Sequence, residues 1–103
     1  MLEYKRPKIS KIMEEITIAL DKGRYIRTDH ASLRMRQRLV PLPDVLNALR
    51  LGWHEPKRDV FDDKFRSWKY SVRGKSVNGN PLRIIVSFDD SDMLIITVIR
   101  LER

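Results

Sequence analysis

The spacing of apolar residues changes at Gly52, and no other feature of the sequence constrains the fold as strongly. Before Gly52, apolar residues recur every three or four positions, as they do on one face of a helix. After Gly52 they alternate with polar residues, as in strands with one buried face. We therefore expect an α+β fold, in which N-terminal helices pack on a C-terminal antiparallel meander of three or four strands.

The length of the chain favours a single domain. Its 103 residues suffice for one small domain with one modest core. Within residues 1–103, we expect residues 1–23 to supply an N-terminal helix and residues 24–103 to supply a core of helix and sheet.

Two segments show strong helical signals. The first, PKISKIMEEITIALDKG (residues 7–23), places its apolar residues on one face, and Pro7 suits a first turn while Gly23 suits the end. The second, LPDVLNALRLG (residues 42–52), has an early proline and is ended by Gly52. Both helices are expected to pack on the sheet.

The segment RTDHASLRMRQR lies between them and predicts another helix. It should begin at Thr28 or Asp29, because either side chain accepts hydrogen bonds from the free amides of a first turn. We expect it to run to about Leu39, with Ala31, Met35 and Leu39 as its buried stripe.

The second half of the chain predicts the strands. Alternation is clear in FRSWKYSVRGKS and LRIIVSF, which the turn signal VNGNP separates, and DVFDD is a candidate for a short strand. The segment MLIITVIRL is apolar on both faces, so we expect it near the centre of the sheet. YIRT reads as a short extended link.

The charge of the protein limits its partners. A net charge of +7 and a pI of about 10.1 attract nucleic acid, an anionic membrane or an acidic protein. The charge is also segregated, because five arginines stand between Arg24 and Arg38 with Asp29 as the only acid. The alternative is that these basic side chains bind no partner and only keep a small domain soluble.

Other classes of protein are disfavoured. The chain has no cysteine for a disulfide or a thiolate metal site. It has no apolar run near the roughly 18 residues of a membrane span, and its first residues are charged. We therefore expect a cytoplasmic protein without a signal peptide, transmembrane helix, metal or cofactor.

The arginine-rich helix also presents a polar face. His30, Arg34 and Gln37 fall close to one line along it. This line presents His30 with Arg34 toward the N-terminal end of the helix, where free amides and a partial positive charge favour phosphate. A histidine in a first turn is equally common as an exposed side chain with no task. The two interpretations remain open.

The predicted strands supply a second basic surface. Lys69, Ser71 and Arg73 share one face of their strand, and Arg83 and Ser87 share a face of the next. No acid occurs from residue 67 to residue 87. This face is suited to a phosphodiester backbone, unless it is merely the wet face of an antiparallel sheet.

Three segments, TDHASLRMRQRLV, VLNALRLG and IITVIR, resemble the bacterial family known as domain of unknown function 4258, over about residues 25 to 100. That family is grouped by architecture with toxin-like ribonucleases of the RelE, ParE and BrnT type. The resemblance implies a RelE/BrnT-like helix-plus-meander domain, RNA cleavage, and pairing with an acidic or DNA-binding antitoxin.

The resemblance also assigns residues. His30 matches the histidine of the family, Arg34 and Arg38 its helical arginines, and Thr97 the threonine of its last strand. The chain departs from the pattern at Leu39, where a glycine is expected, and at Ile99, where an aromatic residue often follows the Thr-Val pair.

Together these observations predict a metal-independent endoribonuclease of the toxin–antitoxin type. Such an enzyme needs a base for the 2′-hydroxyl, an acid for the leaving oxygen and cations for the phosphate. Tyr70 either stacks on a base or belongs to the core. The candidate catalytic residues are His30, Arg34, Arg73 and Thr97, and the candidate RNA-binding residues are Arg27, Arg38, Lys69 and Arg83.

Two other functions use the same surfaces. A non-catalytic module would bind RNA, DNA or an acidic protein through the basic face, and would depend little on His30. A pure interaction protein would act as one half of a two-gene pair. The substrate sequence and the oligomeric state stay open.

Overall fold

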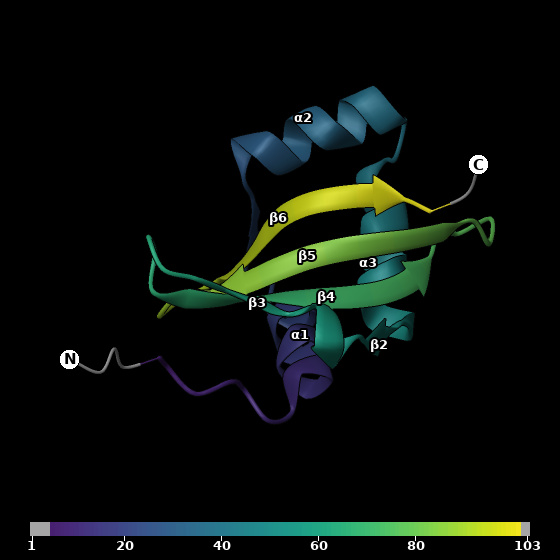
Figure 1. The fold of residues 1–103 in the computed structure, drawn as a ribbon. Helices are drawn as coiled ribbons and strands as arrows, with labels where there is room; N and C mark the ends of the chain where they lie inside the picture. Colours follow the sequence, from purple (N-terminus) through teal and green to yellow (C-terminus); the bar gives the residue numbers. More distant parts are fainter. Residues whose placement is uncertain (1–4, 102–103) are drawn as a thin grey trace.

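The computed structural model describes residues 5–101, which form an α+β domain with three α-helices and a six-stranded mixed sheet (Figure 1). The sheet order is β1-β6-β5-β4-β2, and β3 pairs with β4 outside this path. The elements are α1 (Ile12–Asp21), β1 (Tyr25–Arg27), α2 (Asp29–Arg38), α3 (Leu42–Leu51), β2 (Trp53–His54), a 3-10 turn η1 (Pro56–Arg58), β3 (Val60–Asp62), β4 (Ser67–Lys75), β5 (Pro81–Phe88) and β6 (Met93–Arg100).

The α+β class is confirmed, but the expected sheet of three or four antiparallel strands is not. The link predicted at YIRT is β1, which pairs in parallel with β6 through the partners Tyr25 and Met93 to Arg27 and Ile95. The short strand β2 adds the opposite edge. As a result β5, and not β6, is the central strand.

The first helix begins later than its sequence predicts. Pro7 lies outside α1, which starts at Ile12, because the residues before it are held against the sheet instead. The Ile9 amide donates to the Tyr70 hydroxyl at 2.9 Å, and the Trp68 indole donates to the Arg6 carbonyl at 2.6 Å. Gly23 follows the helix with a φ of +66°, as its position predicted.

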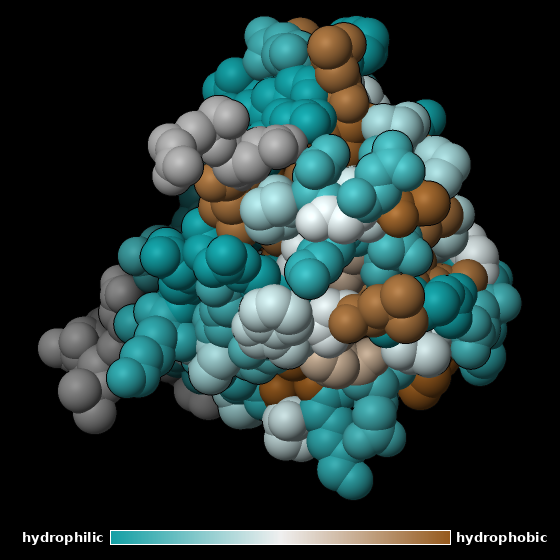
Figure 2. All heavy atoms as spheres, turned by 90° about the vertical axis from the view of Figure 1, so that its right-hand side faces the viewer, coloured by the Kyte–Doolittle hydropathy of each residue, from teal (hydrophilic) through white to brown (hydrophobic). Residues whose placement is uncertain are grey.

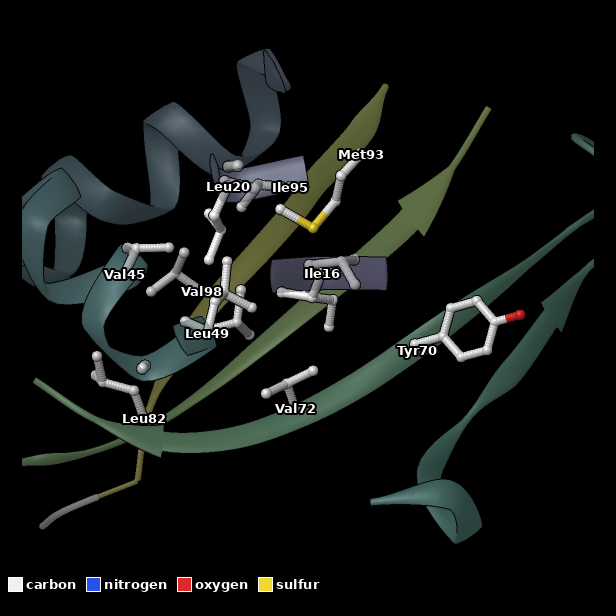
Figure 3. Packing of buried hydrophobic residues seen from close by; sticks show 14 of the residues in the cluster. Ile16, Leu20, Val45, Leu49, Tyr70, Val72, Leu82, Met93, Ile95 and Val98 are labelled. Carbon is white, nitrogen blue, oxygen red and sulfur yellow. The ribbon is translucent and has the colours of Figure 1, made fainter. Parts of the chain in front are cut away.

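The core lies between one face of the sheet and the helices α1 and α3 (Figure 3). Ile16, Leu49 and Val72 are completely buried there and come from a helix, a second helix and a strand. Tyr70 is also buried and belongs to the same cluster, at its edge, with its ring pointing away from the other labelled side chains. Tyr70 is therefore a core residue and not a platform for a base.

The helix α2 lies along the outer edge of β6, beyond the short strand β1 (Figure 1). Ala31 and Met35 are buried as predicted, but Leu39 is 82% exposed. Leu39 adopts a left-handed conformation with a φ of +55° at the end of the helix, which turns its side chain away from the stripe. The predicted buried stripe is therefore one residue shorter.

Within residues 5–101, no helix combines the length and the apolar composition needed to cross a membrane.

Two glycines allow α3 and β4 to approach closely. A Cβ atom at Gly74 would lie 2.3 Å from the Ala48 carbonyl oxygen, and one at Gly52 would lie 2.4 Å from the same atom. Because backbone atoms cannot move aside as a flexible side chain can, α3 would have to shift to accommodate either methyl group.

We expect Gly74→Ala to lower the free energy of unfolding by at least about 2 kcal/mol, because it overpacks the contact between α3 and β4. Urea unfolding followed by circular dichroism measures this. Lys75→Ala is the control, because Lys75 is exposed on the same strand and should change stability by less than about 0.5 kcal/mol. Equal stability of the two variants would contradict the close contact.

Candidate functional site

The face of the sheet opposite the core carries a groove. It consists of two hollows of about 680 and 560 Å³ that share His30, Lys69 and Ile96 in their walls. The groove lies between the start of α2, the β3–β4 hairpin and the β5–β6 turn, which all occur at one end of the sheet (Figure 1). We call it the sheet-face groove.

His30 enters this groove because of its place in the first turn of α2. Thr28 caps the helix, and its hydroxyl oxygen accepts the Ala31 amide at 3.0 Å. The same hydroxyl donates to the Ile95 carbonyl of β6 at 3.0 Å, which fixes the helix start against the strand. His30 is exposed, and its ring has no hydrogen bond or ion pair with residues 5–101.

Thr97 reaches the same groove from β6. The register between β5 and β6 shifts at Ile85 and Val86, so Ile96 is an extra residue in a bulge. Ile85 pairs with Thr97, and both side chains line the smaller hollow with His30. The structure therefore brings together two residues that lie 67 positions apart in the sequence, 97 minus 30.

Lys69, which the sequence made a candidate for RNA binding, also lines the groove. It lies on β4, opposite Val60 of β3, and lines both hollows. Its ammonium is 3.1 Å from an oxygen of Asp62, so its charge is shared with a carboxylate. Hydrogen bonds lower the pKa of Asp62. The bond from the Phe65 amide is the largest cause, and the bond from the Lys69 ammonium is the next.

The sheet face is not free of acids, in contrast to the expectation from residues 67–87. Glu55, in the link after β2, receives the Arg83 guanidinium through two hydrogen bonds of 2.7 and 3.1 Å. It also accepts the Ser71 hydroxyl at 2.9 Å. The hydrogen bond from Arg83 is the largest cause that lowers the pKa of Glu55 to about 2.

A second carboxylate covers the neighbouring part of the sheet. The side chain of Asp59 is completely buried, with one oxygen 2.7 Å from His54 Nε2 and 2.9 Å from the Lys8 ammonium. Its other oxygen accepts the Ser71 amide at 3.0 Å. These contacts attach the segment before α1 and the β2–β3 link to the sheet, so His54 has a structural role.

The predicted arginines do not converge on His30. Arg34 donates to Gln37 at 2.9 Å, one turn further along α2, and Arg38 donates to the Val98 carbonyl on the edge of β6. Arg73 pairs with Arg83 across the strands, and its side chain has no hydrogen bond or ion pair with residues 5–101. Arg27 lines a different hollow, which is formed by β1, α2 and the residues between α2 and α3.

Four residues that matter here were not singled out from the sequence. Glu55 and Asp59 follow an edge strand of two residues, which no alternation pattern can indicate. Phe65 and Asp90 line the larger hollow from turns. The signal available for Phe65 was an aromatic residue between Lys64 and Arg66 in a turn.

The fold and groove define a small α+β domain with a basic helix on the edge of a mixed sheet. The sequence model described as "Domain of unknown function (DUF4258)" matches residues 27–100, so the chain belongs to that family. No curated protein and no solved structure matches it significantly.

The Glu55–Arg83 pair predicts how stability depends on pH. Because the folded pKa of Glu55 is about 2 and the ordinary value is 4.5, its contribution is present above pH 4.5 and is lost as the pH falls toward 2. We expect Glu55→Gln to lower the free energy of unfolding at pH 7 by about 2 kcal/mol. The difference from wild type should shrink below pH 4.5 in urea titrations at several pH values.

Asp21→Asn is the matched control, because it removes one partner of the exposed Arg50–Asp21 pair, 2.8 Å apart. It should cost less than about 1 kcal/mol at neutral pH. A Glu55→Gln loss that stays constant from pH 7 to pH 2 would contradict the pKa argument.

Proposed function

We propose that the protein is an RNA-binding, metal-independent endoribonuclease of the toxin–antitoxin type, with an architecture like that of RelE and BrnT. The observation that carries the proposal is the position of His30, in a groove shared with Thr97 and Lys69. An exposed imidazole that makes no hydrogen bond or ion pair with residues 5–101 is available for proton transfer beside an anionic backbone.

The reaction proposed is attack by a ribose 2′-hydroxyl on the adjacent phosphorus. The base removes the 2′-hydroxyl proton, the bond from phosphorus to the 5′-oxygen breaks, and that oxygen takes up a proton as a cyclic phosphate forms. His30 is the candidate for moving these protons. The Thr97 hydroxyl and the Lys69 ammonium are the candidates for holding the phosphate oxygens in the groove.

The free cations outside the groove support RNA binding. Arg73 on the sheet and Arg27 and Arg36 near α2 have no ion pair with any described residue, 5 to 101. Such unpaired guanidinium groups release counterions when they meet phosphates, which makes binding steeply dependent on salt. They are suited to guiding a long polyanion toward the groove and not to reacting with it.

We expect His30→Ala to lower the rate of RNA cleavage by at least about 100-fold, because general acid–base catalysis contributes on this scale. The measurement is cleavage of a total RNA pool by purified protein in EDTA, across a salt series. Leu33→Ala is the control, because it shortens an exposed side chain of the same helix that lines neither hollow of the groove. Equal cleavage by wild type and His30→Ala would contradict the proposal.

The second candidate is a non-catalytic binding module, and the pairing of charges favours it. Lys69 and Arg83 are both held by carboxylates, so fewer cations face a phosphate than the sequence suggested. If neither wild type nor His30→Ala cleaves RNA, while both bind RNA with the same salt dependence, the protein is better described as a non-catalytic binding module.

The proposed partner is an acidic antitoxin. A hollow of about 610 Å³ behind α2 is lined by Arg27, Arg36 and Leu39. Hydrophobic atoms are exposed among hydrophilic side chains at the top of the molecule, where α2 lies (Figure 2). An apolar anchor flanked by carboxylates would complement this hollow.

We expect the protein, when co-expressed with the product of the neighbouring gene, to elute from gel filtration as a complex. Leu39→Asp should reduce the amount of complex at least 10-fold, because it places a negative charge where an acidic segment would bind. Val77→Asp is the control, because Val77 is exposed in the β4–β5 turn, away from this hollow. A wild-type protein that elutes alone would contradict the partner.

A further inference from the structure

Phe65 is a large hydrophobic side chain that is mostly exposed to solvent. It stands in the turn between β3 and β4, is 71% exposed, and lines the larger hollow of the sheet-face groove together with His30. The hairpin that carries it projects beyond the sheet at the end where α2 begins (Figure 1). A single exposed apolar side chain is ordinary, but Phe65 shares its hollow with Leu94 and Ile96, and a contiguous apolar surface of this kind is typical of a binding site.

The turn holds Phe65 in one place. An oxygen of Asp62 accepts the amides of Lys64 and Phe65 at 2.9 and 3.1 Å, and its other oxygen pairs with Lys69. Arg66 then takes a left-handed conformation with a φ of +54°. Because the backbone is fixed by these contacts, a ligand that stacks on the ring does not have to order the turn first.

The surroundings of the ring suit a flat apolar surface better than a phosphate. Leu94 and Ile96 line the same hollow, and Ile85 continues this apolar surface in the adjoining one. The Lys64 ammonium lies 5.5 Å from the centroid of the Phe65 ring. The ammonium lies over one face of the ring, so a nucleobase would stack on the opposite face, with its own flat face against carbon atoms.

One carboxylate in the same hollow is paired with no other residue in the described part of the chain. Asp89 uses one oxygen to accept the amides of Ser91 and Asp92, which closes the β5–β6 turn. Asp90 lines the hollow, is exposed, and has no hydrogen bond or ion pair with residues 5–101. An ionised carboxylate only accepts hydrogen bonds, so it selects a ligand that donates them.

Among the four bases of RNA, guanine answers this requirement best. Its N1–H and N2–H groups lie side by side and match the two oxygens of one carboxylate, whereas adenine and cytosine offer an amino group beside an acceptor. We propose that the sheet-face groove binds an unpaired guanine of single-stranded RNA, stacked on Phe65, with Asp90 accepting its N1–H and N2–H. That the ligand is RNA is taken from the proposed function.

The test is fluorescence anisotropy with short labelled oligouridines that carry one central G, A, C or U. The sugars are 2′-fluoro, so the oligonucleotides lack the 2′-hydroxyl and stay intact during the measurement. We expect wild type to bind the oligonucleotide with G about 10-fold more tightly than the other three. Phe65→Ala should weaken that binding about 5- to 100-fold, and Phe65→Tyr should retain it.

Asp90→Asn should remove the preference for G and leave binding of the other three oligonucleotides unchanged or slightly tighter. Asp63→Asn is its control, because it makes the same charge change in the β3–β4 turn at a residue that does not line the hollow. Val77→Ala is the control for Phe65→Ala, because it shortens an exposed apolar side chain elsewhere.

Equal binding of all four oligonucleotides by wild type would overturn the assignment, as would unchanged binding by Phe65→Ala. These results are independent of the cleavage assay. If the protein binds the oligonucleotide with G selectively but cleaves no RNA, the guanine site is supported and the proposed ribonuclease activity is rejected. If His30→Ala abolishes cleavage while Phe65→Ala does not affect it, and the protein shows no preference for G, the ribonuclease activity is supported and the guanine site is rejected.

Discussion

The contact of Thr28 with the edge of β6 determines where the other parts of the groove can lie. One hydroxyl group accepts the Ala31 amide of α2 and donates to the carbonyls of Ile95 and Ile96, at 3.0 and 3.3 Å. The start of the helix is thereby tied to the bulge of the strand. Because His30 is two residues after Thr28 and Thr97 directly follows the bulge, one threonine positions both ends of the candidate site.

The C-terminal end of α2 is also attached to the edge of β6, through arginine side chains. The strand β1 pairs only with the first part of β6, so the later carbonyls on that edge need other donors. Arg38 donates to the Val98 carbonyl, and Arg100 donates at 2.9 Å to the Arg38 carbonyl in return. Part of the basic character of α2 therefore protects a sheet edge, which leaves fewer arginines for the proposed binding of RNA.

The local features of the fold could be predicted from the sequence, and the long-range ones could not. The start of α2 followed from the capping chemistry of Thr28, and the faces of β4 and β5 followed from alternation. The parallel pairing of β1 with β6 and the ion pair between Glu55 and Arg83 depend on contacts between distant residues. The left-handed Leu39 is local, but a leucine gives no sign of that conformation, which glycine usually adopts at the end of a helix. The groove shows the same limit, because exposure of Phe65 is a tertiary property.

The pairing of charges explains why a basic protein would recognise a base as well as a backbone. Phosphate contacts are alike at every nucleotide, so they supply affinity without choice. On the sheet face Lys69 and Arg83 are already paired with carboxylates, and the remaining groove wall is mostly carbon. Selectivity in such a groove has to come from stacking and from unpaired acceptors, whereas the unpaired arginines outside it would hold the chain of phosphates. Under the proposed function, the two tasks would be divided between neighbouring surfaces, so one small domain would combine a high net charge with an apolar binding site.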